Sequence, residues 1–287
     1  MKVTNKYNLP SALVKAVEGH EHRKANFSVT QLLKGATEIA LETMFPYKLE
    51  MDVSDMVNMM LGTAVHKLFE EQEEVGVLNE HYMETTSFAG QTVSGTADAI
   101  DTTTRMIIDY KTCSSWKFIY KDFDDWREQI KSYLYLWWRE TGELYLDGKI
   151  VAIIKDWSPT DLLRIEDYPK SPVMSISFEY TEAEIYGVGE RWNDKLEEVF
   201  KKLVSQDFGC CSKEERWAKE EKWALMKKGA KKAVKLYDTE EEANEAKGED
   251  SNLYVEYRAG KDVKCDSYCV AGACGLCPYK NGKENKA

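Results

Sequence analysis

The chain has 287 residues, of which 43% are hydrophobic and 31% are charged, so it is long enough for one large domain or two small ones with a packed core. Its net charge of −11 counts against a protein that coats nucleic acid non-specifically, because phosphate binding needs lysine and arginine. No run of about 18 apolar residues occurs, which excludes an ordinary membrane-spanning helix.

The cysteines and the N-terminal residues bear on the cellular compartment. Residues 1–6 lack the apolar stretch of a signal peptide. Seven cysteines without such a signal indicate a reducing cytoplasm, where clustered cysteines bind metal more often than they form disulfides. We therefore expect a cytoplasmic protein with no membrane partner.

The first part of the chain predicts an arm followed by a helix. Residues 1–26 are polar and weakly periodic, which is typical of an N-terminal arm. Ser28 and Gln31 form a capping box, which predicts a helix that begins there. This helix is expected to run to Phe45, where Pro46 ends it.

A second helix is predicted from Ser54 to about Gln72, and it carries Gly62 and His66 on one face. A glycine inside a helix costs about 1 kcal/mol relative to alanine, so we interpret Gly62 as a position of close packing. Such packing would let His66 approach the structure beneath the helix. Taken alone, a histidine of this kind is more often a hydrogen-bonded, partly buried side chain than a metal ligand.

Two strands are expected to bring acidic side chains to one point. A hairpin over Tyr82–Asp101 delivers Asp98, and the apolar run that follows predicts a strand over Met106–Thr112. Asp109 and Lys111 are two apart in this strand and therefore point the same way. Burying these groups is costly unless something pairs with them, and a divalent cation held by the two aspartates would do so. An isolated Asp-x-Lys, in contrast, is usually an ordinary strand end.

The middle of the chain continues the alternation of strands and helices. Gln129 and Tyr133 are four apart on one face of a predicted helix. Asp147 and Gly148 predict a turn before the next strand. The other elements expected here are a helix over Trp126–Arg139, strands over Ile150–Ile154 and Met174–Tyr180, and a helix from a capping box at Thr181 and Glu184 to about Leu203. This order predicts an α/β core with a mixed sheet over residues 27–205.

Residues 206–287 differ in character and predict a small α+β extension. Three short strands and a polar helix over Thr239–Ala246 precede a run of four cysteines at the end of the chain. The expected strands and the cysteines are Trp223–Met226, Ala233–Tyr237, Leu253–Tyr257, Cys265, Cys269, Cys274 and Cys277. A local run of lysines, residues 227–232, is either a patch that binds phosphate or a solvated hairpin face.

Four short motifs follow one another in a fixed order: Gly62-x3-His66, Gly95-x2-Asp98, Ile108-Asp109-Tyr110-Lys111 and Gln129-x3-Tyr133. On these motifs, residues 27–205 resemble the PD-(D/E)XK nuclease superfamily in its RecB-like exonuclease branch, which includes CRISPR-associated adaptation nucleases. The tail is similar to that of phage-borne members through Glu214-Glu215-Arg216-Trp217 and the terminal cysteines. The resemblance implies a restriction-endonuclease-like core with a mixed central β-sheet flanked by helices, in a bacterial or phage-infected cell.

The resemblance also implies roles for the motif residues. His66, Asp98, Asp109 and the carbonyl of Tyr110 would bind Mg²⁺ or Mn²⁺. Asp98, Asp109 and Lys111 would be catalytic, with Lys111 orienting or activating the attacking water and stabilising the charge that grows on phosphate. Gln129 and Tyr133 would hold the DNA strand or brace the site.

For the cysteines, the resemblance implies a [4Fe–4S] cluster held by one upstream and three C-terminal cysteines. The best-known members have the upstream cysteine before the core, but no cysteine precedes Cys113 here. The candidate ligands are Cys211, Cys265, Cys269 and Cys277, and Cys274 is either a spare or a replacement for one of them. A zinc site made by the terminal four cysteines and the absence of any bound metal remain the alternatives.

The sequence thus predicts a metal-dependent DNA nuclease, an exonuclease on single strands or DNA ends in recombination, repair or DNA processing. Its partner is DNA, with a recombination or replication protein as a further partner. One alternative is a catalytically inactive nuclease-fold module that binds DNA or such a protein, and another is a structure-specific endonuclease.

Overall fold

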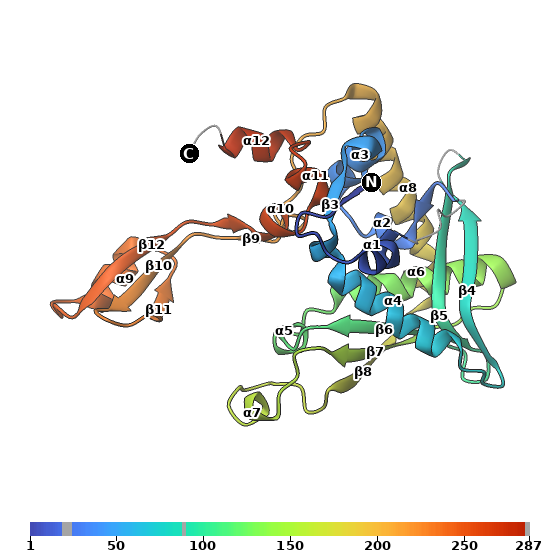
Figure 1. Ribbon diagram of the computed structural model, residues 1–287, viewed down its shortest axis with the longest axis horizontal. Coiled ribbons are helices and arrows are strands. Elements are labelled where there is room, and N and C mark those ends of the chain that lie inside the picture. Colours follow the sequence, from blue (N-terminus) through green and yellow to red (C-terminus); the bar gives the residue numbers. More distant parts are fainter. Residues whose placement is uncertain (19–24, 88–89, 285–287) are drawn as a thin grey trace. The chain divides into compact units, whose positions relative to one another are not determined.

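A computed structural model describes residues 1–18, 25–87 and 90–284 of the chain (Figure 1). Residues 19–24, which belong to the predicted N-terminal arm, lie outside the described residues. The chain divides into two compact units, residues 1–207 and residues 208–287. No helix in the described part is long and apolar enough to cross a membrane.

The first unit is built on a mixed six-stranded sheet (Figure 1). Its strands are β2 (Phe27–Ser28), β4 (Val77–Thr86), β5 (Thr92–Asp101), β6 (Met106–Cys113), β7 (Asp147–Ile154) and β8 (Val173–Glu179). β5 pairs with β4 along one edge and with both β2 and β6 along the other. The β2–β5 and β6–β7 pairs are parallel, and the β4–β5, β5–β6 and β7–β8 pairs are antiparallel.

Helices cover both faces of this sheet. The larger ones are α3 (Ala36–Met44), α4 (Val57–Glu70), α6 (Asp124–Thr141) and α8 (Glu182–Ser205). Tyr110 stacks on Phe69 of α4, whereas its neighbour Asp109 contacts Gln129 of α6. Because successive side chains of a strand point to opposite faces, α4 and α6 lie on opposite sides of β6. Ile130, Leu134 and Leu136 of α6 are fully buried, and α8 packs against α6 and α3.

The N-terminal residues add a second, small sheet. β1 (Lys2–Thr4) pairs in parallel with β3 (Glu50–Asp52), and α1 (Ser11–Glu18) follows β1. Val17 of α1 is buried with two residues of the 3₁₀ helix η2 (Val53–Met56). The remaining short elements of the unit are α2 (Val29–Leu32), η1 (Pro46–Lys48), α5 (Trp116–Ile119) and α7 (Pro159–Leu162).

The structure tests several of the predicted helix boundaries. Capping boxes are present at Ser28 and at Thr181, each with reciprocal hydrogen bonds to the third helical residue. The single helix expected from Ser28 to Phe45 is wrong, because the chain forms α2 and α3 in its place. Gly35 separates them with an extended backbone (φ −69°, ψ 148°) at the N-cap of α3.

Two interpretations of glycines are also wrong. Gly148 lies within β7 rather than in a turn, and a Cβ there would meet Ile130 Cγ2 of α6 at 2.1 Å. This glycine therefore permits close approach of helix and sheet. Gly62, which we interpreted as closely packed, has room for a Cβ, since the nearest atom would be Thr112 Oγ1 at 3.9 Å.

The second unit is α+β. Its strands are β9 (Ala218–Lys219), β10 (Lys222–Lys227), β11 (Ala233–Tyr237), β12 (Leu253–Arg258) and β13 (Lys261–Asp262). They form a three-stranded sheet in the order β11-β10-β12 and a two-stranded ribbon of β9 and β13, and α9 (Glu240–Lys247) packs on the larger sheet. Three short helices contain or adjoin the terminal cysteines: α10 (Val263–Ser267), α11 (Val270–Ala273) and α12 (Pro278–Glu284). The predicted fold class, an α/β core with a mixed sheet flanked by helices plus a small α+β element with the cysteines, is confirmed.

Candidate metal centre

The site forms where β5 and β6 stop pairing. Their antiparallel ladder ends at the pair Ala99 and Ile108, so the next two residues, Asp98 and Asp109, face each other beyond the last pair. Asp98 Oδ2 accepts a hydrogen bond of 2.6 Å from the backbone N–H of Tyr110. The two predicted acidic residues therefore lie on adjacent strands at a gap in the sheet, and this gap is open to a side chain from α4.

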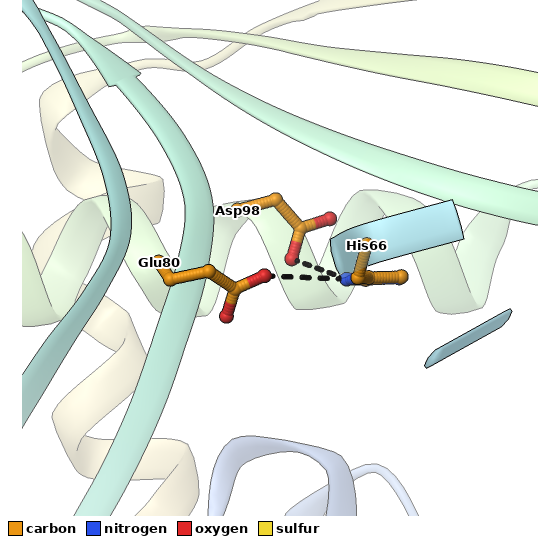
Figure 2. A group of neighbouring side chains, drawn as sticks. All are labelled: His66, Glu80 and Asp98. Atoms are coloured by element: carbon orange, nitrogen blue, oxygen red, sulfur yellow. Dashed lines mark ion pairs between the residues drawn. The ribbon is translucent and has the colours of Figure 1, made fainter. Parts of the chain in front are cut away.

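His66 of α4 points toward Asp98 and Glu80 (Figure 2). Its Nδ1 lies 3.1 Å from Asp98 Oδ1 and 3.6 Å from Glu80 Oε1. Hydrogen bonding to Asp98 and then to Glu80 raises the pKa of His66 to about 10. The two carboxylates thus stabilise the protonated imidazole, and a metal ion bound through this nitrogen would displace its proton.

Glu80 is a member of this group that the sequence analysis missed. It lies on β4 between the pairs Asn79–Ala99 and His81–Ala97, so its position is directly opposite Asp98. Its φ of 45° is in the left-handed region, which is rare for a non-glycine residue inside a strand and costs on the order of 1–3 kcal/mol. Figure 2 shows its carboxylate turned toward His66. The sequence analysis began the hairpin at Tyr82. Extending its first strand back to Val77 would have placed Glu80 opposite Asp98.

The donor atoms of His66, Glu80 and Asp98 all lie within 4.8 Å of one another. One imidazole nitrogen with two carboxylate oxygens is a donor set that suits a divalent cation such as Mn²⁺ or Mg²⁺. The residues present therefore fit the divalent metal ion that the sequence resemblance implies. Of the predicted ligands, the structure brings His66 and Asp98 into this group.

Asp109 lies beside this group, with a side chain that is only 1% exposed. Its Oδ2 forms an ion pair of 2.7 Å with Lys111 Nζ. Burial raises the pKa of Asp109 to about 6, against the opposing effect of Lys111. A buried carboxylate is costly unless cations lie beside it; Lys111 supplies one here, and a bound metal ion would supply another.

Gln129 and Tyr133 lie under Asp109 on α6, and both are buried. Gln129 Nε2 donates to Tyr133 Oη at 2.7 Å and lies 3.4 Å from Asp109 Oδ1. A Cβ on Gly95 would come within 2.7 Å of the Tyr133 ring, so the glycine of the Gly95-x2-Asp98 motif makes room for that ring.

Four cysteines of the second unit influence one another electrostatically. Burial, and then Glu215, Cys277, Cys265 and Cys269, raise the pKa of Cys211 to about 12. Burial, and then mainly Cys269, raise the pKa of Cys265 to about 11. Among the residues that the structure describes, no three cysteine sulfur atoms lie within 4.8 Å of one another.

No protein-family model and no curated protein matches the chain. Among solved structures, the chain is similar to SSO0001 with 18% identity over 64% of this chain and 83% of that one, at a TM-score of 0.46. It is similar to a phage-related exonuclease from Haemophilus somnus 129PT with 15% identity over 60% and 82% of the two chains, at a TM-score of 0.38. It is also similar to the alkaline exonuclease LHK-Exo from Laribacter hongkongensis, with 13% identity over 69% and 96% of the chains and a TM-score of 0.39. Similarity at this level does not establish an activity for this chain.

Proposed function

We propose that this protein is a metal-dependent DNA nuclease that hydrolyses phosphodiester bonds. The observation that carries the proposal is the end of the β5–β6 ladder, where Asp98 and Asp109 meet His66 and Lys111. Two carboxylates, an imidazole and an ammonium group at one point are the groups that metal-assisted phosphodiester hydrolysis requires. The same residues carry the sequence resemblance to the PD-(D/E)XK superfamily.

The metal ligands that we propose are His66, Asp98, Asp109 and the carbonyl of Tyr110, with Glu80 as a further ligand. Glu80 is included because it shares the cluster with His66 and Asp98. An imidazole among carboxylates suits Mn²⁺ somewhat better than Mg²⁺. When bound, the ion supplies Lewis acidity toward the phosphate and lowers the pKa of water.

Lys111 is placed to act at the boundary between the buried acid and solvent. Its side chain is 21% exposed, and its Nζ lies 2.7 Å from Asp109 Oδ2. In the proposed mechanism, Lys111 orients the attacking water and stabilises the charge that develops on the phosphate. Gln129 and Tyr133 are buried and bonded to each other, so we assign them the bracing of Asp109 rather than contact with DNA.

The finer assignment is an exonuclease on single strands or DNA ends, in bacterial or phage recombination, repair or DNA processing. This part of the proposal rests on the order and spacing of the four motifs, which resemble the RecB-like branch. DNA is the proposed partner.

We also propose that Cys211, Cys265, Cys269 and Cys277 bind a [4Fe–4S] cluster in the second unit. Their mutual influence on pKa supports this set of four. A tetrahedral zinc site on the terminal cysteines is the alternative.

The experiment is degradation of end-labelled single- and double-stranded DNA, beside a closed circular duplex, with Mg²⁺ or Mn²⁺. The proposal predicts that linear DNA is degraded, that a chelator stops the reaction, and that the circle survives. A protein that is inert on every substrate with both ions contradicts the nuclease assignment, and cutting of the circle replaces the exonuclease with an endonuclease.

A further inference from the structure

A lysine-rich hairpin stands out in the second unit. The lysine hairpin, residues 222–237, consists of β10, β11 and the turn between them (Figure 1), and its 16 residues contain six lysines and no acidic residue. The turn is well formed, because Lys228 N–H donates to Asn252 O at 2.8 Å and Ala230 N–H donates to Lys227 O at 2.9 Å. Gly229, with φ of 80°, supplies the left-handed residue that this turn requires.

Most of these lysines have no acidic partner. Lys222 pairs with Asp238 at the base of the hairpin. Among the described residues, the other five lysines of the hairpin form no ion pair, namely Lys227, Lys228, Lys231, Lys232 and Lys235. The next segment, residues 238–250, contains seven acidic residues, so carboxylates are available within the same small sheet. Lys235 lines a pocket with Glu242 and Glu245 of α9, whereas the four lysines at or beside the turn, Lys227, Lys228, Lys231 and Lys232, are exposed and form a local positive surface.

Acidic residues are in excess in the first unit but not in the second. Residues 1–207, which contain the candidate metal centre, have 23 lysines and arginines against 35 acidic residues. Residues 208–287 have 16 against 15. A unit with such an acidic excess repels a polyanion at long range, so an enzyme that holds DNA needs cationic side chains elsewhere.

Aromatic rings accompany the lysines on one face of the sheet. Lys227 shares its face with Trp223, four residues earlier on β10, and Lys235 lies opposite Leu225 on the same face. Tyr257, 54% exposed, is the cross-strand partner of Trp223, and their ring centroids are 5.1 Å apart. Lysines for phosphates combined with rings for stacking are typical of surfaces that bind single-stranded nucleic acid.

We propose that the lysine hairpin is a binding surface for single-stranded DNA, separate from the metal centre. Its lysines contact the phosphates, and the exposed ring of Tyr257 offers a stacking surface to an unpaired base. The choice of DNA as the polyanion rests on the proposed nuclease function, but the binding itself does not depend on catalysis. The proposal places part of the DNA affinity of this acidic protein in the second unit.

The test is fluorescence anisotropy of labelled oligo(dT) with the full chain at several salt concentrations, in a chelator and with Asp109→Ala throughout to prevent cleavage. The hairpin variant changes the five unpaired lysines to alanine. The matched control changes five exposed lysines of the first unit to alanine, namely Lys6, Lys15, Lys48, Lys170 and Lys201. A third variant changes the five hairpin lysines to arginine.

We expect the hairpin variant to bind about 100-fold more weakly at low salt, and the slope of log K against log salt to fall by about 0.7 for each lost phosphate contact. The control and the arginine variant should bind like the parent. Equal binding of oligo(dT) by the hairpin variant and the control overturns the proposal. Displacement of labelled oligo(dT) by polyglutamate as effectively as by unlabelled oligo(dT) also overturns it, because the surface would then be assigned to acidic proteins. If the protein degrades DNA but the hairpin variant binds oligo(dT) like the parent, only the binding-surface proposal is wrong. If the protein has no nuclease activity but the hairpin lysines bind oligo(dT) in a salt-dependent way, only the nuclease assignment is wrong.

Discussion

Asp109 and Glu80 are both held in unusual environments at the candidate site. Asp109 is buried with Lys111 Nζ as its ion-pair partner, and Glu80 holds a left-handed backbone inside a strand. The backbone conformation of Glu80 costs on the order of 1–3 kcal/mol. Residues with unfavourable backbone or burial whose side chains converge on one point are expected at functional sites. A cation bound between the two carboxylates would offset part of these costs.

Glu80 gives the sharpest test at the scale of a residue. Glu80→Gln keeps the size of the side chain and removes its charge, so we expect the affinity for Mn²⁺ to fall by about 10–100-fold or more. Isothermal titration calorimetry measures this affinity directly. Glu84→Gln on the same strand is the control, because Glu84 bonds to Tyr82 Oη outside the cluster. Equal affinities for the two variants would remove Glu80 from the ligand set.

At the scale of elements, two glycines near the site have opposite packing. Gly95→Ala puts a methyl group within 2.7 Å of the Tyr133 ring, and overpacking of this kind destabilises by about 1–3 kcal/mol. Gly62→Ala adds a methyl group that makes an ordinary van der Waals contact with Thr112 Oγ1 at 3.9 Å, and alanine in a helix stabilises by about 0.5–1 kcal/mol. Urea denaturation measures both free energies of unfolding. A destabilised Gly62→Ala, or an unchanged Gly95→Ala, would contradict the packing described here.

The elements also show what the sequence could and could not predict. Local signals worked: the capping boxes at Ser28 and Thr181 are present, and the apolar run at Met106 forms a strand that ends in the acidic motif. Features that depend on distant partners were missed. Gly148 reads as a turn residue until Ile130 is packed against it, and Glu80 gains its meaning only from its cross-strand position opposite Asp98.

The motif residues also differ in how much of their role the sequence could predict. The order of the motifs selected His66 and Asp98, which the fold brings together, because each lies in a locally predictable helix or strand. The sequence could not say whether Gln129 reaches DNA or the interior, since that depends on how α6 packs on the sheet. In the structure it lies 3.4 Å from Asp109 Oδ1 and is buried.

At the scale of the whole molecule, six of the seven cysteines lie in the second unit, whereas the candidate metal centre lies in the first. We expect Cys277→Ala to lose bound iron and sulfide and to destabilise the second unit, because a site of this kind contributes folding free energy. Cys274→Ala is the matched control and should keep both. Iron, sulfide and zinc analysis of anaerobically purified protein measures the outcome. Zinc in place of iron, or equal loss of metal in both variants, would contradict the assigned ligand set.

The most direct test of the central claim is the rate of nucleotide release from end-labelled single-stranded DNA with Mn²⁺, for the parent chain, Asp109→Ala and Lys111→Ala, with Asp101→Ala as control. Asp101 is at the end of β5, where it caps a turn through Thr103 and Thr104. We predict that both site variants stay folded and lose at least about 100-fold in rate, since each removes a group that acts on the developing charge or the ion. The control should keep the parent rate. Site variants that release nucleotides as fast as the parent would show that the gap between β5 and β6 is not an active site.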